Sequence, residues 1–192
     1  AAIRTDFENN DDFDVNIAMP HCLIGWTDAW DLLSGTDLAP QGALDTAADA
    51  IAEVTRKFHA AFVLDEGTRR LMLTPAQNNH PIRTAAAIGY VGLGLWDHPL
   101  ALSFRDWAFS ELDYLWGEDG HYQGEDGGVS EGPFYSSYAW TPSLVVFAAL
   151  ENSGRRLDLL RSCLNRNDAD PWTDHGCIEG EPFTFDNPLR SE

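Results

Sequence analysis

An amide and an imidazole stand side by side at a predicted helix start. Asn78, Asn79 and His80 precede Pro81, and proline suits the first turn of a helix because no backbone N–H is needed there. The backbone N–H groups at such an end favour a bound carboxylate, and the imidazole can accept or release a proton near neutral pH. The alternative is an ordinary asparagine cap followed by a histidine that faces solvent.

Aromatic residues mark the start of a later predicted helix. Tyr135 and Tyr138 follow Glu131 and are three positions apart, so they share one helical face, and Trp140 comes shortly after. A phenol can act as an acid or a base when nearby positive charge or hydrogen bonds lower its pKa. The same rings could equally be packing between helices.

Charge and cysteine usage restrict the classes of partner. The chain has 12 Lys and Arg against 31 Asp and Glu, a net charge of −19, which disfavours nucleic acid and acidic membranes. The same charge repels an anionic polysaccharide, unless the cleft is locally basic or the salt concentration is high. Three cysteines without a C-x-x-C motif do not indicate zinc, although a Cys163–Cys177 bridge is possible. The acidic loop over residues 117–132 does not match a calcium-binding spacing, and no metal or cofactor is predicted.

Apolar spacing of three and four residues predicts a helical protein. Residues 41–63 carry one apolar stripe, and the helix from His80 is rich in Ala and Gly, which implies close packing against other helices. Residues 1–19 and 165–192 are predicted to be irregular. The fold class is therefore all-α, with antiparallel helix pairs. The predicted helices run from Pro20 to Gly35, over 41–63, from His80, from Pro99 to Gly117, over 133–151 and over 155–164.

The two helix starts resemble those of the alginate lyase and heparinase II/III-like polysaccharide lyases. The likeness rests on the Asn-His pair and on Tyr135 some 55 residues after His80, on the run from Asp126 to Tyr138, and on residues 183–188. It implies a single partial (α/α) toroid over residues 1–192, an incomplete toroid of antiparallel helix hairpins without the C-terminal β-sandwich domain of relatives. The arginine that relatives often carry shortly before the tyrosine is missing here.

The resemblance implies β-elimination on a uronic-acid polysaccharide, in the periplasm or outside the cell. Asn79 would neutralise the substrate carboxylate, His80 or Tyr135 would remove the C5 proton, and Tyr135 would protonate the leaving oxygen. The expected substrate contacts are Asn78, Arg83, Glu131, Tyr138 and Trp140. Two alternatives stay open: an (α/α) glycoside hydrolase that uses carboxylates such as Asp119 or Glu131, and a non-catalytic glycan-binding fragment.

Overall fold

The protein is helical throughout most of the part that can be described. A computed structural model describes residues 13–60, 79–116 and 132–155, together with residues 122, 129, 157, 165–166, 175–176, 185 and 187–189. The all-α prediction is confirmed, since every long element in these ranges is a helix. The helices are α1 Phe13–Ser34, α2 Gln41–His59, α4 Asn79–Gly94, α5 Ala101–Trp116 and α6 Gly132–Ser153; β1 Asn165–Arg166 and β2 His175–Gly176 form a short antiparallel pair.

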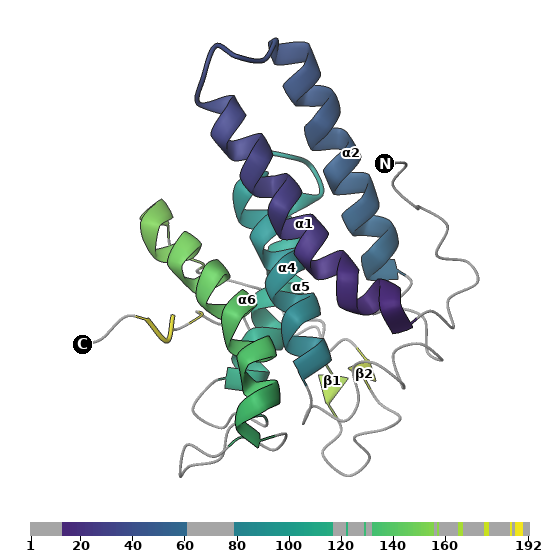
Figure 1. The fold of residues 1–192 in the computed structure, drawn as a ribbon, viewed down its shortest axis with the longest axis vertical. Helices are drawn as coiled ribbons and strands as arrows, with labels where there is room; N and C mark the ends of the chain where they lie inside the picture. Colours follow the sequence, from purple (N-terminus) through teal and green to yellow (C-terminus); the bar gives the residue numbers. More distant parts are fainter. Residues whose placement is uncertain are drawn as a thin grey trace.

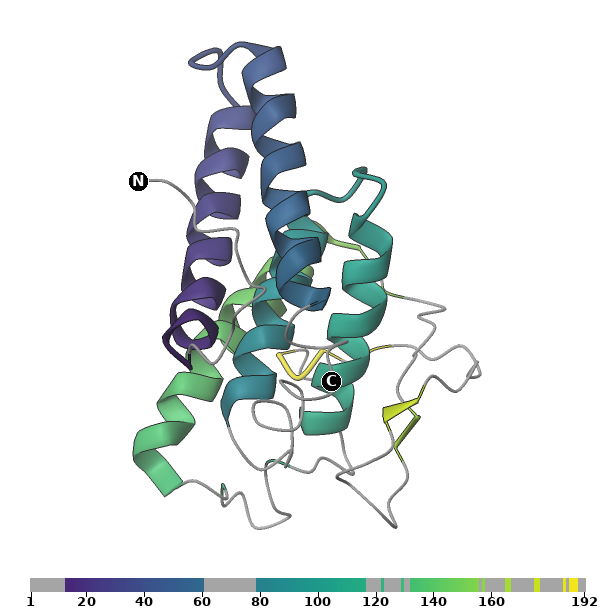
Figure 2. The ribbon, with the colours of Figure 1, turned by 90° about the vertical axis from the view of Figure 1, so that its right-hand side faces the viewer.

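The helices pack as antiparallel hairpins around α4. Helices α1 and α2 run in opposite directions, as do α4 and α5, and the α1–α2 hairpin extends beyond the rest of the molecule (Figures 1 and 2). Helix α4 packs against α1, α2, α5 and α6. Helices α1, α4 and α6 each run upward from their first residues in both views, and α4 and α6 begin in the lower part of the molecule.

Small residues allow α4 to occupy this central position. Ala85, Ala86 and Ala87 are fully buried. A Cβ atom on Gly92 would lie 2.8 Å from Cγ of Arg105 in α5 and 3.1 Å from the backbone oxygen of Ala101, so only glycine fits there. The close packing predicted from the Ala- and Gly-rich sequence is confirmed.

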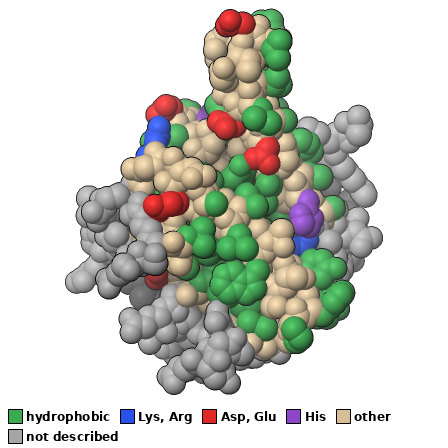
Figure 3. Space-filling model, turned by 60° about the vertical axis from the view of Figure 1, so that its left-hand side comes forward, with side chains coloured by type: hydrophobic (Ala, Val, Ile, Leu, Met, Phe, Trp, Pro, Cys, Tyr) green, Lys and Arg blue, Asp and Glu red, His purple; other side chains and the backbone are tan. Residues whose placement is uncertain are grey.

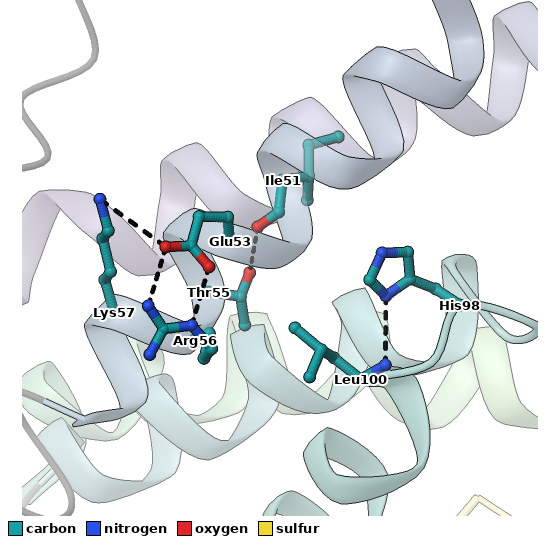
Figure 4. A network of polar contacts seen from close by, with 7 residues as sticks. All are labelled: Ile51, Glu53, Thr55, Arg56, Lys57, His98 and Leu100. Carbon is teal, nitrogen blue, oxygen red and sulfur yellow. Dashed lines mark hydrogen bonds and ion pairs between the residues drawn. The ribbon is translucent and has the colours of Figure 1, made fainter.

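Helix α2 has one buried and one charged face, as its sequence predicts. Leu44, Ile51, Val54 and Phe58 are buried, whereas Glu53 accepts hydrogen bonds from Arg56 at 2.7 and 2.8 Å on the exposed face (Figure 4). The helix ends at His59, and residues 61–63, to which the prediction extended it, lie outside the described residues.

A histidine fixes the connection between α4 and α5 against α2. The Nδ1 atom of His98 accepts a hydrogen bond from the backbone N–H of Leu100 at 3.2 Å (Figure 4). The proton is therefore on Nε2, which lies 3.3 Å from Oδ1 of Asp49 in α2. This contact joins the two hairpins at the end opposite to the start of α4.

Two predicted boundaries are wrong. Helix α1 begins at Phe13 and passes through Pro20, where we expected residues 1–19 to be irregular and a helix to follow the proline. Buried Met19 and Leu23 flank Pro20, and their packing offsets the backbone hydrogen bond that proline cannot make. The helix expected to start at Arg155 does not start there, because Gly154 ends α6 with a φ of 62° and Arg155 and Leu157 are not helical.

Other boundaries agree with the sequence. Helix α1 ends just before Gly35, and α5 extends to Trp116. The interruption that Pro142 suggested does not occur, because α6 continues through it to Ser153. Within the ranges described, none of the helices is long and apolar enough to span a membrane.

Candidate functional site

The two helix starts singled out by the sequence are neighbours in space. Asn79 and His80 lie in the first turn of α4, and Tyr135 lies in the first turn of α6. One turn further along each helix, the guanidinium carbon of Arg83 lies 5.8 Å from the centroid of the Tyr138 ring. Helix packing thus brings the amide, the imidazole and the tyrosines to one end of the molecule.

The start of α6 presents aromatic rings to solvent. Gly132 has a φ of 76°, which a residue with a side chain rarely adopts, and the helix begins there. The exposed fractions are 69% for Phe134, 50% for Tyr135 and 40% for Tyr138. Their rings are in contact, with centroids 5.3 to 6.0 Å apart. We call these three residues the aromatic cluster; the sequence analysis had not singled out Phe134.

The start of α4 is enclosed instead. Asn79 is only 4% exposed, and His80 is half-buried. Burial, and then the charge of Arg83, lower the pKa of His80 to about 4. The His80 imidazole is therefore uncharged at neutral pH, and one of its ring nitrogens carries a lone pair that can take a proton.

Arg83 lies beneath the surface and contacts other side chains. It is 3% exposed, and burial lowers its pKa, although a guanidinium stays charged at any physiological pH. Its Nη2 atom lies 3.2 Å from Nε2 of His21 in α1, and its charge faces the Tyr138 ring. Arg83 therefore contacts residues of both α1 and α6. Its contact with substrate stays a prediction.

His21 is a second residue of this region that sequence reasoning missed. It lies on α1, 62 positions before Arg83, and no motif surrounds it. Its ring is exposed and contacts Arg83, the residue that also lies against Tyr138 of the aromatic cluster. Only the packing of α1 on α4 could have identified it.

Trp140 belongs to the packing between α5 and α6. Its ring lies 4.3 Å from that of Trp116, whose indole N–H donates a hydrogen bond to Ser143 Oγ at 3.0 Å. Tyr122 contacts the same Trp116 ring edge-on at 5.1 Å. Trp116 covers part of Trp140, so Trp140 offers a sugar less surface than the exposed aromatic cluster does.

The third stretch of the resemblance also packs against the helices. In the run 183–188, Phe185 and Asn187 are buried, and the side-chain amide of Asn187 donates to the backbone oxygen of Phe147 at 2.9 Å. The Phe185 ring lies between those of Phe109 and Phe147, at 4.9 and 5.8 Å. These residues attach the segment to α5 and α6, away from the helix starts.

Several predicted residues lie outside the described part of the chain. They are Asn78, Asp119, Glu131, Cys163 and Cys177. Cys22 is exposed and forms no disulfide. The portion that can be described holds no group of three or more His, Cys, Asp or Glu side chains that could bind a metal ion.

The surface around the site is mixed in character. On the side of the molecule that includes α6, a histidine and a basic side chain lie together beside a cluster of hydrophobic side chains, whereas acidic side chains lie toward the projecting hairpin (Figure 3). Among the residues that the structure describes, acidic side chains are therefore not spread evenly over this face (Figure 3).

Comparisons with protein-family models, with curated proteins and with solved structures found no match to this chain. The likeness to polysaccharide lyases therefore rests on the residues quoted above.

Proposed function

We propose that the chain is the catalytic part of a polysaccharide lyase, a partial (α/α) toroid that cleaves a uronic-acid polysaccharide by β-elimination. The observation that carries the proposal is the contact between Arg83 and Tyr138, which sets the start of α4 beside the start of α6. An amide, a neutral imidazole and a phenol at one end of the molecule are the groups this reaction needs. The antiparallel hairpins are compatible with such a toroid.

The first requirement is to stabilise charge on the substrate. The C5 proton of a uronate is weakly acidic, and removing it puts negative charge on the carboxylate group. Asn79 and the N-terminal end of α4 would bind that carboxylate and stabilise the charge as it develops. Because Asn79 is 4% exposed, the substrate has to displace the groups that now cover its amide.

The second requirement is a base. The neutral His80 can accept the C5 proton, but a pKa of about 4 makes it a weak base in the empty site. A substrate carboxylate bound nearby favours the protonated imidazole, so binding itself raises the pKa of His80. Tyr135 replaces His80 as the base where the sugar epimer presents its C5 proton on the other face.

The third requirement is an acid for the leaving oxygen. Tyr135 is half exposed in the first turn of α6, so a sugar chain can reach its hydroxyl group. Its phenol would protonate the glycosidic oxygen as the bond breaks, and a 4,5-unsaturated sugar end remains. Phe134 and Tyr138 offer apolar ring faces for sugar rings, and these contacts do not depend on charge. A protein that cleaves polysaccharides of this kind would act in the periplasm or outside the cell.

The products of the reaction test the proposal. The purified chain should be incubated with alginate, heparan sulfate, hyaluronan, chondroitin sulfate and ulvan. A lyase gives products that absorb in the ultraviolet because of the new double bond. New reducing ends without that absorbance would instead identify a glycoside hydrolase, and binding without any product would identify a non-catalytic glycan-binding fragment.

A further inference from the structure

Helix α1 brings a second histidine to the site. His21 is exposed, and its Nε2 atom lies 3.2 Å from Nη2 of the buried Arg83. Helix α4, which carries Arg83, packs against both α1 and α6. Arg83 therefore contacts both His21 in α1 and Tyr138 in α6.

The contact with Arg83 determines which ring nitrogen of His21 carries the proton. A guanidinium has only donors, so Nε2 of His21 must be the acceptor and cannot bear a hydrogen. The neutral ring then carries its hydrogen on Nδ1. Burial, and then the charge of Arg83, lower the pKa of His21, so the ring stays neutral at physiological pH.

The remaining donor of His21 is directed away from Arg83. The two nitrogens of an imidazole project from different edges of the ring, so a ring whose Nε2 faces Arg83 directs its Nδ1–H elsewhere. Among the residues that the structure describes, His21 has its one side-chain hydrogen bond with Arg83. The exposed ring thus offers a neutral donor whose orientation is fixed by a buried cation.

We propose that His21 is a substrate-binding residue that donates an Nδ1–H hydrogen bond to a hydroxyl or carboxylate oxygen of the sugar unit next to the one that is cleaved. Arg83 is the positioning residue that fixes the tautomer and orientation of His21. The inference rests on the proposed function and extends it: the sugar chain lies across the start of α4, between His21 on α1 and the aromatic cluster on α6. A neutral donor at this position binds a uronate without competing with Asn79 for the reacting carboxylate.

Two substitutions of His21 separate this role from a structural one. His21→Ala removes both the acceptor for Arg83 and the outward donor, and we expect KM to rise about three- to tenfold, the usual effect of one hydrogen bond, with kcat within about twofold. His21→Gln keeps both functions, because its amide oxygen can accept from Arg83 while its NH₂ group donates outward, so it should restore KM to within about twofold. Cys22→Ala, at the exposed neighbouring position on α1, is the matched control and should change neither constant.

The experiment distinguishes failure of this inference from failure of the proposed function. If the wild-type chain forms unsaturated products and His21→Ala leaves KM unchanged, the lyase assignment stands and the role of His21 is overturned. If the wild-type chain forms no product, calorimetric affinities for tetramannuronate and tetraguluronate decide: a loss of about three- to tenfold in His21→Ala, recovered in His21→Gln, supports the contact. Equal affinities, or no binding by the wild-type chain, overturn it.

The tautomer can be checked without any sugar. Nitrogen NMR of the full chain should show His21 with a protonated Nδ1 and an unprotonated Nε2 at neutral pH. Arg83→Met should abolish that preference, because the ring then loses the donor that selects it. A ring protonated on Nε2 in the wild-type chain would overturn the proposed role of Arg83.

Discussion

The starts of α4 and α6 lie side by side but differ in their exposure to solvent. In α4, Asn79 and Arg83 are 4% and 3% exposed within the first five residues of the helix. In α6, Phe134 and Tyr135 are 69% and 50% exposed, and the buried positions begin only at Ala139. One helix start is enclosed by neighbours, and the other presents its rings to solvent.

The difference follows from the position of each helix. Helix α4 is surrounded by α1, α2, α5 and α6, so even its polar first turn is desolvated, and burial shifts the pKa of His80 to about 4. Helix α6 packs on α4 mainly through its later turns, which leaves its first turn accessible. The enclosed start holds groups whose protonation is shifted by burial, and the open start leaves its rings accessible to solvent.

The largest expected effect comes from the open helix start. Tyr135→Phe removes the proposed acid, and loss of a general acid or base typically lowers turnover about 10²- to 10⁴-fold. Because the ring and its contacts with Phe134 and Tyr138 remain, binding of a uronate oligosaccharide should stay within about threefold. The rate of ultraviolet-absorbing product and a binding isotherm measure the two effects. Phe134→Tyr is the control, and unchanged turnover in Tyr135→Phe would remove Tyr135 from the mechanism.

The next effect tests the enclosed helix start. Asn79→Ala removes the proposed donor to the carboxylate and should cost about 2–4 kcal/mol of transition-state stabilisation, seen as a loss in kcat/KM. Because Asn79 is buried, the melting temperature has to be measured in parallel. Asn79→Asp keeps the shape but adds negative charge, so it should be at least as inactive. Near-normal rates in a folded Asn79→Ala variant would refute the carboxylate-binding role.

A pair of substitutions compares the packing of the two regions. Gly92→Ala places a methyl group 2.8 Å from Arg105 Cγ, and we expect it to lower the free energy of unfolding by about 1–3 kcal/mol. Phe134→Ala on the exposed start of α6 should change it by no more than about 0.5 kcal/mol. Urea denaturation of both variants measures the difference. Similar losses in the two would contradict the contrast between an enclosed and an open helix.

The smallest effect concerns pH. The pKa of His80 is about 4 in the folded chain and near 6.5 in the unfolded chain, so the unfolded state binds more protons between these values. Stability should therefore fall as the pH drops from about 6.5 to 4. The part that His80 contributes should be about 1.5 kcal/mol, since the ring is only partly buried. His80→Gln should reduce the slope of unfolding free energy against pH in this window, and parallel curves for the two proteins would contradict the shift.

Much of the helical framework was predictable from local sequence. The apolar stripe of α2, the Ala- and Gly-rich character of α4, and the stops at Gly35 and Gly117 are all local signals, and the structure agrees with them. The start of α1 and the helix start expected at Arg155 were predicted wrongly. Packing around Pro20 outweighs its intrinsic cost, and Gly154 was not recognised as a helix end.

The sequence by itself determined which chemical groups stand at the starts of α4 and α6, because caps, prolines and glycines act within one turn of helix. Only the tertiary structure decided which of these groups are buried and what they contact. The burial of Arg83, its contact with His21 across 62 positions and the pairing of Trp140 with Trp116 depend on which helices lie next to each other. That arrangement is set by the packing of whole helix faces, to which residues far apart in the chain contribute.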